Sequence, residues 1–178
     1  RELNLFRVRQ MMPLLLAGWE RLSKEDFVRV LRLVSVISFR YSVVSGLNTN
    51  ALEPAYHLAA KAVLAGTAST PAQIFEHLRP IYIEDGKFER DFALLGLDTG
   101  NNRKKLTKYI LARLEEDASG KACDPETDPA TTEHVLPENP LDGWAELVPR
   151  EKWNESVYRL GNLALLEASL NREIANAE

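Results

Sequence analysis

Residues 131–139 read TTEHVLPEN, and residues 158–171 read YRLGNLALLEASLN. The first stretch predicts a short extended segment ending at Pro137, because proline cannot continue a strand ladder and favours an extended backbone before it. The second leads into a last helix of roughly residues 165–176, and Leu163, Leu166 and Leu170 fall on one helical stripe. An extended segment followed by a helix predicts a small α+β module over residues 131–178.

The sequence before this module predicts helices. Apolar residues recur at helical spacing through most of residues 1–116. Ser23 and Thr70, the latter followed by a proline, are typical of helix starts. Residues 117–130 are rich in Asp, Gly, Ser and Pro and predict a linker or mobile loop. The predicted fold class is therefore mainly α, with a helical domain at 1–116 followed by the module.

One predicted helix of this region is markedly amphipathic. It begins at Asn101 or Asn102, and its apolar side comprises Leu106, Tyr109, Ile110, Ala112 and Leu114. Its other side comprises Arg103, Lys104, Lys105, Lys108 and Arg113. Such a charged side fits a solvated helix face, and it also fits a surface that contacts phosphates.

Composition excludes several classes of protein. The 178 residues are 45% hydrophobic and 27% charged, as in an ordinary globular protein. No apolar run reaches the roughly 18–20 residues that cross a bilayer, so we expect a cytosolic protein without a membrane partner. The single cysteine, Cys123, excludes an internal disulfide framework and a Cys-rich zinc site. The net charge of −4 argues against DNA, but residues 1–50 carry eight Lys or Arg against four Asp or Glu.

Four polar residues of the last third are candidates for chemistry. Neighbouring residues of a strand point to opposite faces, so Glu133 and His134 also fit an exposed acid beside a capping histidine. Asn162 follows a glycine and also fits a turn or N-cap residue. Asn171 also fits a helix residue that faces solvent. Each residue alone therefore has a structural interpretation.

Together, these residues resemble a known nuclease motif. Glu-His-x-x-Pro, then Asn-Leu-x-x-Leu, then a ligand position nine residues after the Asn resembles the HNH, or ββα-metal, motif. The resemblance implies that Glu133 and Asn171 are metal ligands, that His134 is the general base and that Asn162 is the orienting asparagine. Oxygen ligands of this kind suit Mg²⁺ or Mn²⁺. Many family members also hold a structural zinc through paired cysteines, which we do not expect with Cys123 alone.

The residues in and around the motif are more specific than a generic HNH pattern. TEHVLPEN, YRLGNLALL and Leu170-Asn171, with Asn176 after them, resemble the DUF1524 domain, which is similar to the C-terminal half of GmrSD-type, modification-dependent restriction enzymes. Residues 39–41 and 46–50 resemble the helical part that precedes it in DUF262/DUF1524 proteins. The Asp-Gly-Gln-Gln-Arg motif of the family's N-terminal nucleotide-binding part is absent, and the chain stops before the usual Phe and Lys. We therefore expect a fragment with a C-terminally truncated nuclease module.

The resemblance implies a metal-dependent DNA endonuclease from a restriction or phage-defence system. Histidine changes charge near neutral pH and is suited to accept a proton from water. The implied partners are DNA and a DUF262-like nucleotide-binding domain that this chain lacks. The candidate phosphate contacts are Arg159, Lys104, Lys105 and Lys108. The alternative is a catalytically inactive helical fragment that couples to DNA or to a partner NTPase domain.

Overall fold

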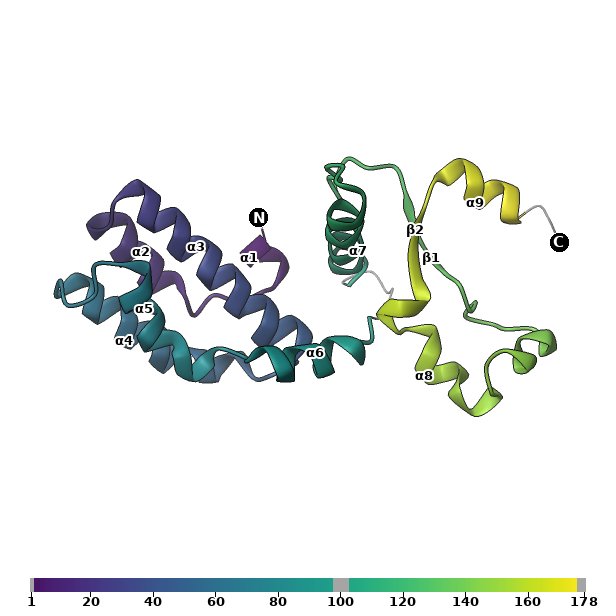
Figure 1. The fold of residues 1–178 in the computed structure, drawn as a ribbon, viewed down its shortest axis with the longest axis horizontal. Coiled ribbons are helices and arrows are strands. Elements are labelled where there is room, and N and C mark those ends of the chain that lie inside the picture. Colours follow the sequence, from purple (N-terminus) through teal and green to yellow (C-terminus); the bar gives the residue numbers. More distant parts are fainter. Residues whose placement is uncertain (1, 98–102, 176–178) are drawn as a thin grey trace. The chain divides into compact units, whose positions relative to one another are not determined.

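The computed structural model describes residues 2–97 and 103–175 (Figure 1). Asn101, Asn102 and Asn176, which the sequence analysis names, lie outside these ranges. The chain forms two compact units, Arg1–Phe92 and Ala93–Glu178. In the described part of the chain, no helix combines the length and the apolar character needed to cross a membrane.

The first unit is helical. Its α-helices are α1 (Glu2–Leu5), α2 (Met12–Arg21), α3 (Lys24–Ser38), α4 (Glu53–Leu64), α5 (Pro71–Leu78) and α6 (Asp85–Ala93). Helix α3 continues as a π-helix, η1 (Phe39–Val44), and 3₁₀ turns occur at η2 (Thr49–Leu52) and η3 (Arg79–Ile81). Helix α2 packs against α3 and α4, and α5 packs against the same two helices. These contacts bury a core that includes Leu14, Val34, Ile37, Tyr56 and Ile74.

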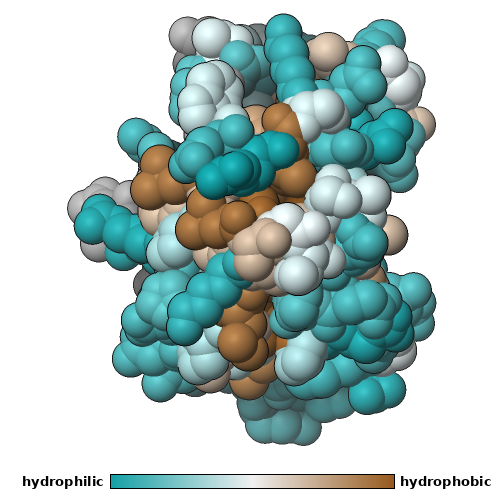
Figure 2. All heavy atoms as spheres, turned by 90° about the vertical axis from the view of Figure 1, so that its left-hand side faces the viewer, coloured by the Kyte–Doolittle hydropathy of each residue, from teal (hydrophilic) through white to brown (hydrophobic). Residues whose placement is uncertain are grey.

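Apolar side chains also gather on an outer face of the first unit (Figure 2). On α2, the exposed apolar residues are Met12, Leu16 and Trp19, which recur at the spacing of one helix face. Trp19 is 75% exposed, although its ring packs edge-on against Phe27. Some apolar residues at helical spacing in this region are therefore exposed rather than buried in the core of the unit.

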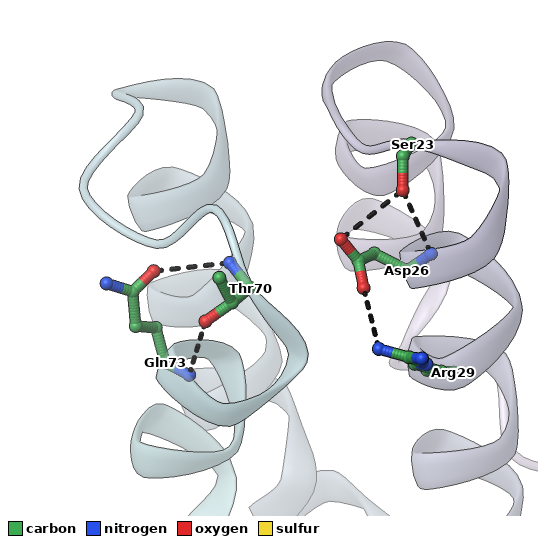
Figure 3. Close-up of polar contacts among 5 residues, drawn as sticks. All are labelled: Ser23, Asp26, Arg29, Thr70 and Gln73. Carbon is green, nitrogen blue, oxygen red and sulfur yellow. Dashed lines mark hydrogen bonds and ion pairs between the residues drawn. The ribbon is translucent and has the colours of Figure 1, made fainter.

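Two helix starts of the first unit are capped as predicted (Figure 3). The hydroxyl of Ser23 accepts a hydrogen bond from the backbone N–H of Asp26 at 3.1 Å. Thr70 and Gln73 form a reciprocal capping box, in which each side chain accepts from the other residue's backbone N–H at 3.3 and 3.2 Å. These bonds satisfy N–H groups that have no partner within the helix.

Replacing Thr70 with alanine is expected to lower the free energy of unfolding of the first unit by about 1 kcal/mol. Alanine cannot accept the hydrogen bond from the N–H of Gln73, which Thr70 accepts in the structure. Chemical denaturation followed by circular dichroism measures the change. The Thr70→Ser variant keeps the hydroxyl and should retain most of the stability, and an equal loss in both variants would contradict the capping role.

The second unit contains helices and a two-stranded sheet. Its elements are α7 (Lys104–Ser119), β1 (Thr131–His134), η4 (Asp142–Glu146), η5 (Arg150–Lys152), α8 (Trp153–Val157), η6 (Leu160–Asn162), β2 (Leu163–Leu166) and α9 (Ala168–Ala175). The strands are antiparallel, and Glu133 pairs with Ala164 and His134 with Leu163. Helix α7 packs against both strands. The predicted mainly α fold with a small α+β module is therefore confirmed.

Residues 95–97 also join the second unit. Gly96 and Arg159 form an antiparallel bridge, the N–H of Leu97 donates to the carbonyl of Tyr158 at 2.7 Å, and that of Leu160 donates to Leu95 at 2.9 Å. The buried apolar residues of this unit are Leu95, Leu97, Ile110, Leu111, Ala112, Leu136, Val157, Leu160 and Leu163. A core built from such separate segments fixes the turn before β2.

The predicted start of the last helix was wrong. Residues 163–166 form β2, and α9 begins only at Ala168. Leu163 is buried and the next residue, Ala164, is exposed, which is the alternation of a strand rather than a helical stripe. Backbone pairing with β1 explains the difference, because a run of leucines and alanine fits either structure until a partner strand is available.

The division of the chain also differs from the predicted boundaries. Helix α7 extends to Ser119, three residues into the predicted linker, and it packs on β1 and β2. It therefore lies in the second unit, whereas the prediction placed residues up to 116 in the helical domain. Its buried residues are Thr107, Ile110, Leu111 and Ala112, so the buried face shares Ile110 and Ala112 with the predicted apolar side and adds Thr107 and Leu111.

Candidate functional site

The four candidate residues come from three neighbouring elements of the second unit. Glu133 and His134 end β1, Asn162 ends the turn η6 that leads into β2, and Asn171 lies in α9. Strand pairing brings the end of β1 beside the start of β2. The structure therefore draws together residues that are up to 38 positions apart in the sequence.

Asn162 holds the chain that follows β1. Its Oδ1 accepts a hydrogen bond from the N–H of Leu136 at 2.7 Å, and its Nδ2 donates to the carbonyl of the same residue at 3.0 Å. The Nδ2 group also donates to the carbonyl of Val157 at 2.9 Å. The N–H of Val135 in turn donates to the backbone carbonyl of Asn162 at 2.9 Å. The amide thus fixes the backbone immediately after His134 rather than the imidazole itself.

The two predicted metal ligands meet on one face of β1. The Nδ2 group of Asn171 donates to Oε1 of Glu133 at 2.7 Å, and it lies 3.4 Å from Oγ1 of Thr131. Thr131 and Glu133 are two residues apart, so their side chains share a face of the strand. Helix α9 therefore presents its asparagine to the acidic side chain at the end of the strand.

His134 lies on the other face, as strand alternation requires. Its side chain is 13% exposed, and the Tyr158 ring packs edge-on against it with 5.8 Å between ring centroids. The Nε2 atom is buried and has no hydrogen-bond partner among the residues that the structure describes. Oε1 of Glu138 lies 4.0 Å from this nitrogen. No sequence pattern indicated a role for Glu138 or Tyr158, because their proximity to His134 depends on the turn after β1 and on the end of α8.

The donor atoms at Glu133 and Asn171 fit a hard divalent cation. A carboxylate and an amide carbonyl are oxygen donors of the kind that Mg²⁺ and Mn²⁺ bind, with water or substrate phosphate at the other positions. Asn171 directs its Nδ2 at Glu133, so its amide must turn over to direct Oδ1 there. Within residues 2–97 and 103–175, no group of three His, Cys, Asp or Glu side chains is suited to hold a metal. A cation at this site would therefore depend on the amide as well as on the acid.

The basic candidates divide into two groups. Lys104 and Lys105 are exposed at the start of α7. Lys108 is partly buried, and its Nζ donates to the backbone carbonyl of Asp128 at 2.6 Å. Arg159 forms an ion pair with Glu155, while its second terminal nitrogen is buried without a hydrogen-bond partner in the described ranges. Lys108 thus tethers the loop between α7 and β1, whereas the two exposed lysines are available to a ligand.

Cys123 lies in this loop. Burial and the neighbouring Asp128, whose Oδ2 is 3.5 Å from the sulfur, raise the pKa of the Cys123 thiol. A raised pKa reduces the fraction of thiolate, which is the nucleophilic form. The raised pKa therefore disfavours Cys123 as a nucleophile.

Comparison with known proteins identifies one family. The family model described as GmrSD restriction endonucleases, C-terminal domain, matches residues 82–178, which is more than half of the chain. The matched range includes all the candidate site residues named above. No curated protein and no solved structure matches the chain.

Proposed function

Because this chain belongs to the family of GmrSD restriction endonuclease C-terminal domains, and so is related to restriction nucleases, we propose that its second unit is a metal-dependent DNA endonuclease of the HNH type. The substrate is DNA, and the reaction is hydrolysis of a phosphodiester bond. The biological role that follows is restriction of foreign, modified DNA in phage defence. The observation that carries the proposal is the 2.7 Å contact between Asn171 and Glu133, beside a β1 terminus that Asn162 holds in place.

Each residue has a distinct role in the proposed reaction. Glu133 and Asn171 hold Mg²⁺ or Mn²⁺ through oxygen atoms. A bound divalent cation supplies Lewis-acid stabilisation of the scissile phosphate and of the leaving oxygen. His134 accepts a proton from the attacking water, and Asn162 positions the backbone that carries His134. The order of the elements, with two strands followed by a helix, supports this assignment.

Hydrolysis needs a proton acceptor close to the attacking water. As the water oxygen bonds to phosphorus, its proton passes to His134, and the bond from phosphorus to the 3′-oxygen breaks. The leaving oxygen then takes a proton from solvent. Lys104 and Lys105 are exposed and would bind flanking phosphates, and Arg159 would do so if its pair with Glu155 opened.

The direct test of the function is conversion of supercoiled plasmid by the purified 178-residue chain with Mg²⁺ or Mn²⁺. We expect nicked or linear DNA with either cation and none with a chelator in excess. Cleavage that persists in the chelator would contradict the proposed mechanism. An inactive chain would instead support the alternative in which it serves as a coupling fragment.

Replacing Glu133 with glutamine is expected to weaken Mn²⁺ binding at least about tenfold, which is about 1.4 kcal/mol. The substitution removes the one negative charge of the Glu133–Asn171 pair while it leaves the size of the side chain nearly unchanged. Isothermal titration calorimetry measures the affinity without any need for cleavage. Glu167→Gln, at an exposed position just before α9, is the matched control and should bind like the wild type. Equal affinities for Glu133→Gln and the wild type would exclude Glu133 as a ligand.

A further inference from the structure

The imidazole of His134 has one enclosed nitrogen. The Nε2 atom is enclosed and makes no hydrogen bond with any residue in the described part of the chain. The side chain is nevertheless 13% exposed, so its contact with solvent lies on other atoms of the side chain. A buried polar nitrogen without a hydrogen-bond partner is unfavourable, and native structures seldom leave one unpaired. This nitrogen therefore needs a hydrogen-bond partner close by: an acceptor if it carries the ring proton, and a donor if it does not.

Glu138 is placed to be that partner, because its carboxylate can accept a hydrogen bond from an Nε2–H. Its Oε1 lies 4.0 Å from Nε2 of His134, which is within ion-pair range but too long for a hydrogen bond. The Glu138 side chain is 49% exposed, so packing restrains it little, and a hydrogen bond to Nε2 requires its carboxylate to move closer. The His134 ring has less freedom, because Tyr158 packs edge-on against it.

The turn between the two residues is held by hydrogen bonds to the side-chain amide of Asn162. Leu136 lies midway between His134 and Glu138, and both its N–H and its carbonyl bond to the Asn162 amide. Leu136 itself is 3% exposed, which anchors the turn in the core. The spacing of His134 and Glu138 is therefore a built feature of the turn and not a chance approach of two surface side chains.

We propose that Glu138 is a positioning residue for His134: its carboxylate accepts the Nε2–H and leaves Nδ1 as the nitrogen without a proton. A carboxylate hydrogen-bonded to one ring nitrogen holds a histidine in a single tautomer and orientation. In the reaction, a step that rests on the proposed function, Nδ1 takes the proton of the attacking water. The Nε2 proton stays on the ring and continues to face Glu138, which stabilises the imidazolium that forms.

The tautomer of His134 provides a test that needs no nuclease activity. Long-range ¹H–¹⁵N spectra of the full chain with labelled histidine distinguish the two neutral tautomers, and the His134→Gln variant identifies the His134 signals among the three histidines. We expect the wild type to show the Nε2–H form. Glu138→Ala and Glu138→Asp, which remove or shorten the acceptor, should show a mixture. Glu138→Gln keeps an oxygen acceptor and should restore the Nε2–H form.

The matched control is Glu146→Ala, which removes an exposed glutamate from η4 in the same segment between the strands. It should leave the tautomer unchanged. In plasmid cleavage, Glu138→Ala should lower kcat by about 10- to 100-fold and leave KM for DNA nearly unchanged. This is expected when a reacting group loses the hydrogen-bond partner that orients it. Glu138→Gln should recover much of the rate.

Two results would overturn the positioning role. One is a wild-type His134 in the Nδ1–H form, and the other is the same tautomer in the wild type, Glu138→Ala and Glu138→Asp. A tautomer shift in a chain that cleaves no DNA would support the contact with Glu138 while the proposed function fails. Cleavage that requires His134 but shows no tautomer shift in these variants would refute the contact and leave the proposed function intact.

Discussion

Replacing His134 with alanine is expected to lower the rate of metal-dependent DNA cleavage by about 10²- to 10⁴-fold, the usual contribution of a general base. The imidazole is at the end of β1, where Asn162 fixes the following turn. No other histidine can replace it in the second unit, because His57 and His77 lie in helices of the first. Single-turnover cleavage of a labelled duplex with Mg²⁺ measures the effect on the chemical step.

His77→Ala is the matched control for this substitution. His77 is exposed in the last turn of α5, so the variant should cleave DNA at the wild-type rate. Added imidazole should restore part of the activity of His134→Ala, because the lost group is a proton acceptor. Full activity of His134→Ala in the absence of imidazole would exclude His134 as the base.

Replacing Asn162 with alanine is expected to destabilise the second unit by roughly 2–4 kcal/mol, since three hydrogen bonds of about 0.5–1.5 kcal/mol each are lost. The substitution leaves the N–H and the carbonyl of Leu136 and the carbonyl of Val157 without these partners. Asn162→Asp should be at least as harmful. It keeps the acceptor for the N–H of Leu136 but places a negative charge beside two carbonyl oxygens.

Urea denaturation followed by tryptophan fluorescence measures this loss. Trp144 and Trp153 report on the second unit, and a Trp19→Phe background removes the signal of the first. Asn154→Ala is the matched control, because Asn154 is exposed on α8 and its loss should cost less than about 0.5 kcal/mol. A cost that small for Asn162→Ala would show that the amide does not hold the turn.

The sequence predicts best those features that depend on nearby residues. Ser23 and Thr70 were identified as helix starts because a capping side chain bonds to a backbone group three residues away. The helical character of the first unit follows in the same way from its periodicity. A local pattern contains all the information that such features need.

Features that depend on distant partners were predicted less well. The residues of β2 are leucines and an alanine, which favour a helix in isolation, and only pairing with β1 makes them a strand. Helix α7 was assigned to the helical domain because a helix can be read from its own residues, whereas the sheet that it covers cannot. Lys108 was assigned to the charged side of its helix, but its Nζ donates to a backbone carbonyl 20 residues later.

The candidate site shows the same division. Resemblance to the nuclease motif singled out Glu133, Asn162 and Asn171, and the structure brings the first and the last into contact. Their roles in catalysis and in metal binding remain predictions. No local pattern predicts the proximity of His134 and Glu138, because the geometry of the turn between them depends on an amide 26 residues beyond Leu136.

The central claim is that Glu133 and Asn171 together hold the cation that cleavage requires. Paramagnetic broadening by Mn²⁺ in ¹H–¹⁵N spectra of the full chain tests it most directly, since broadening depends steeply on distance from the ion. At low Mn²⁺, the account predicts that the Asn171 side-chain amide and the backbone signals of Glu133 and His134 broaden first, and that Glu133→Gln abolishes this effect. Broadening that begins elsewhere, or that is unchanged in Glu133→Gln, would contradict it.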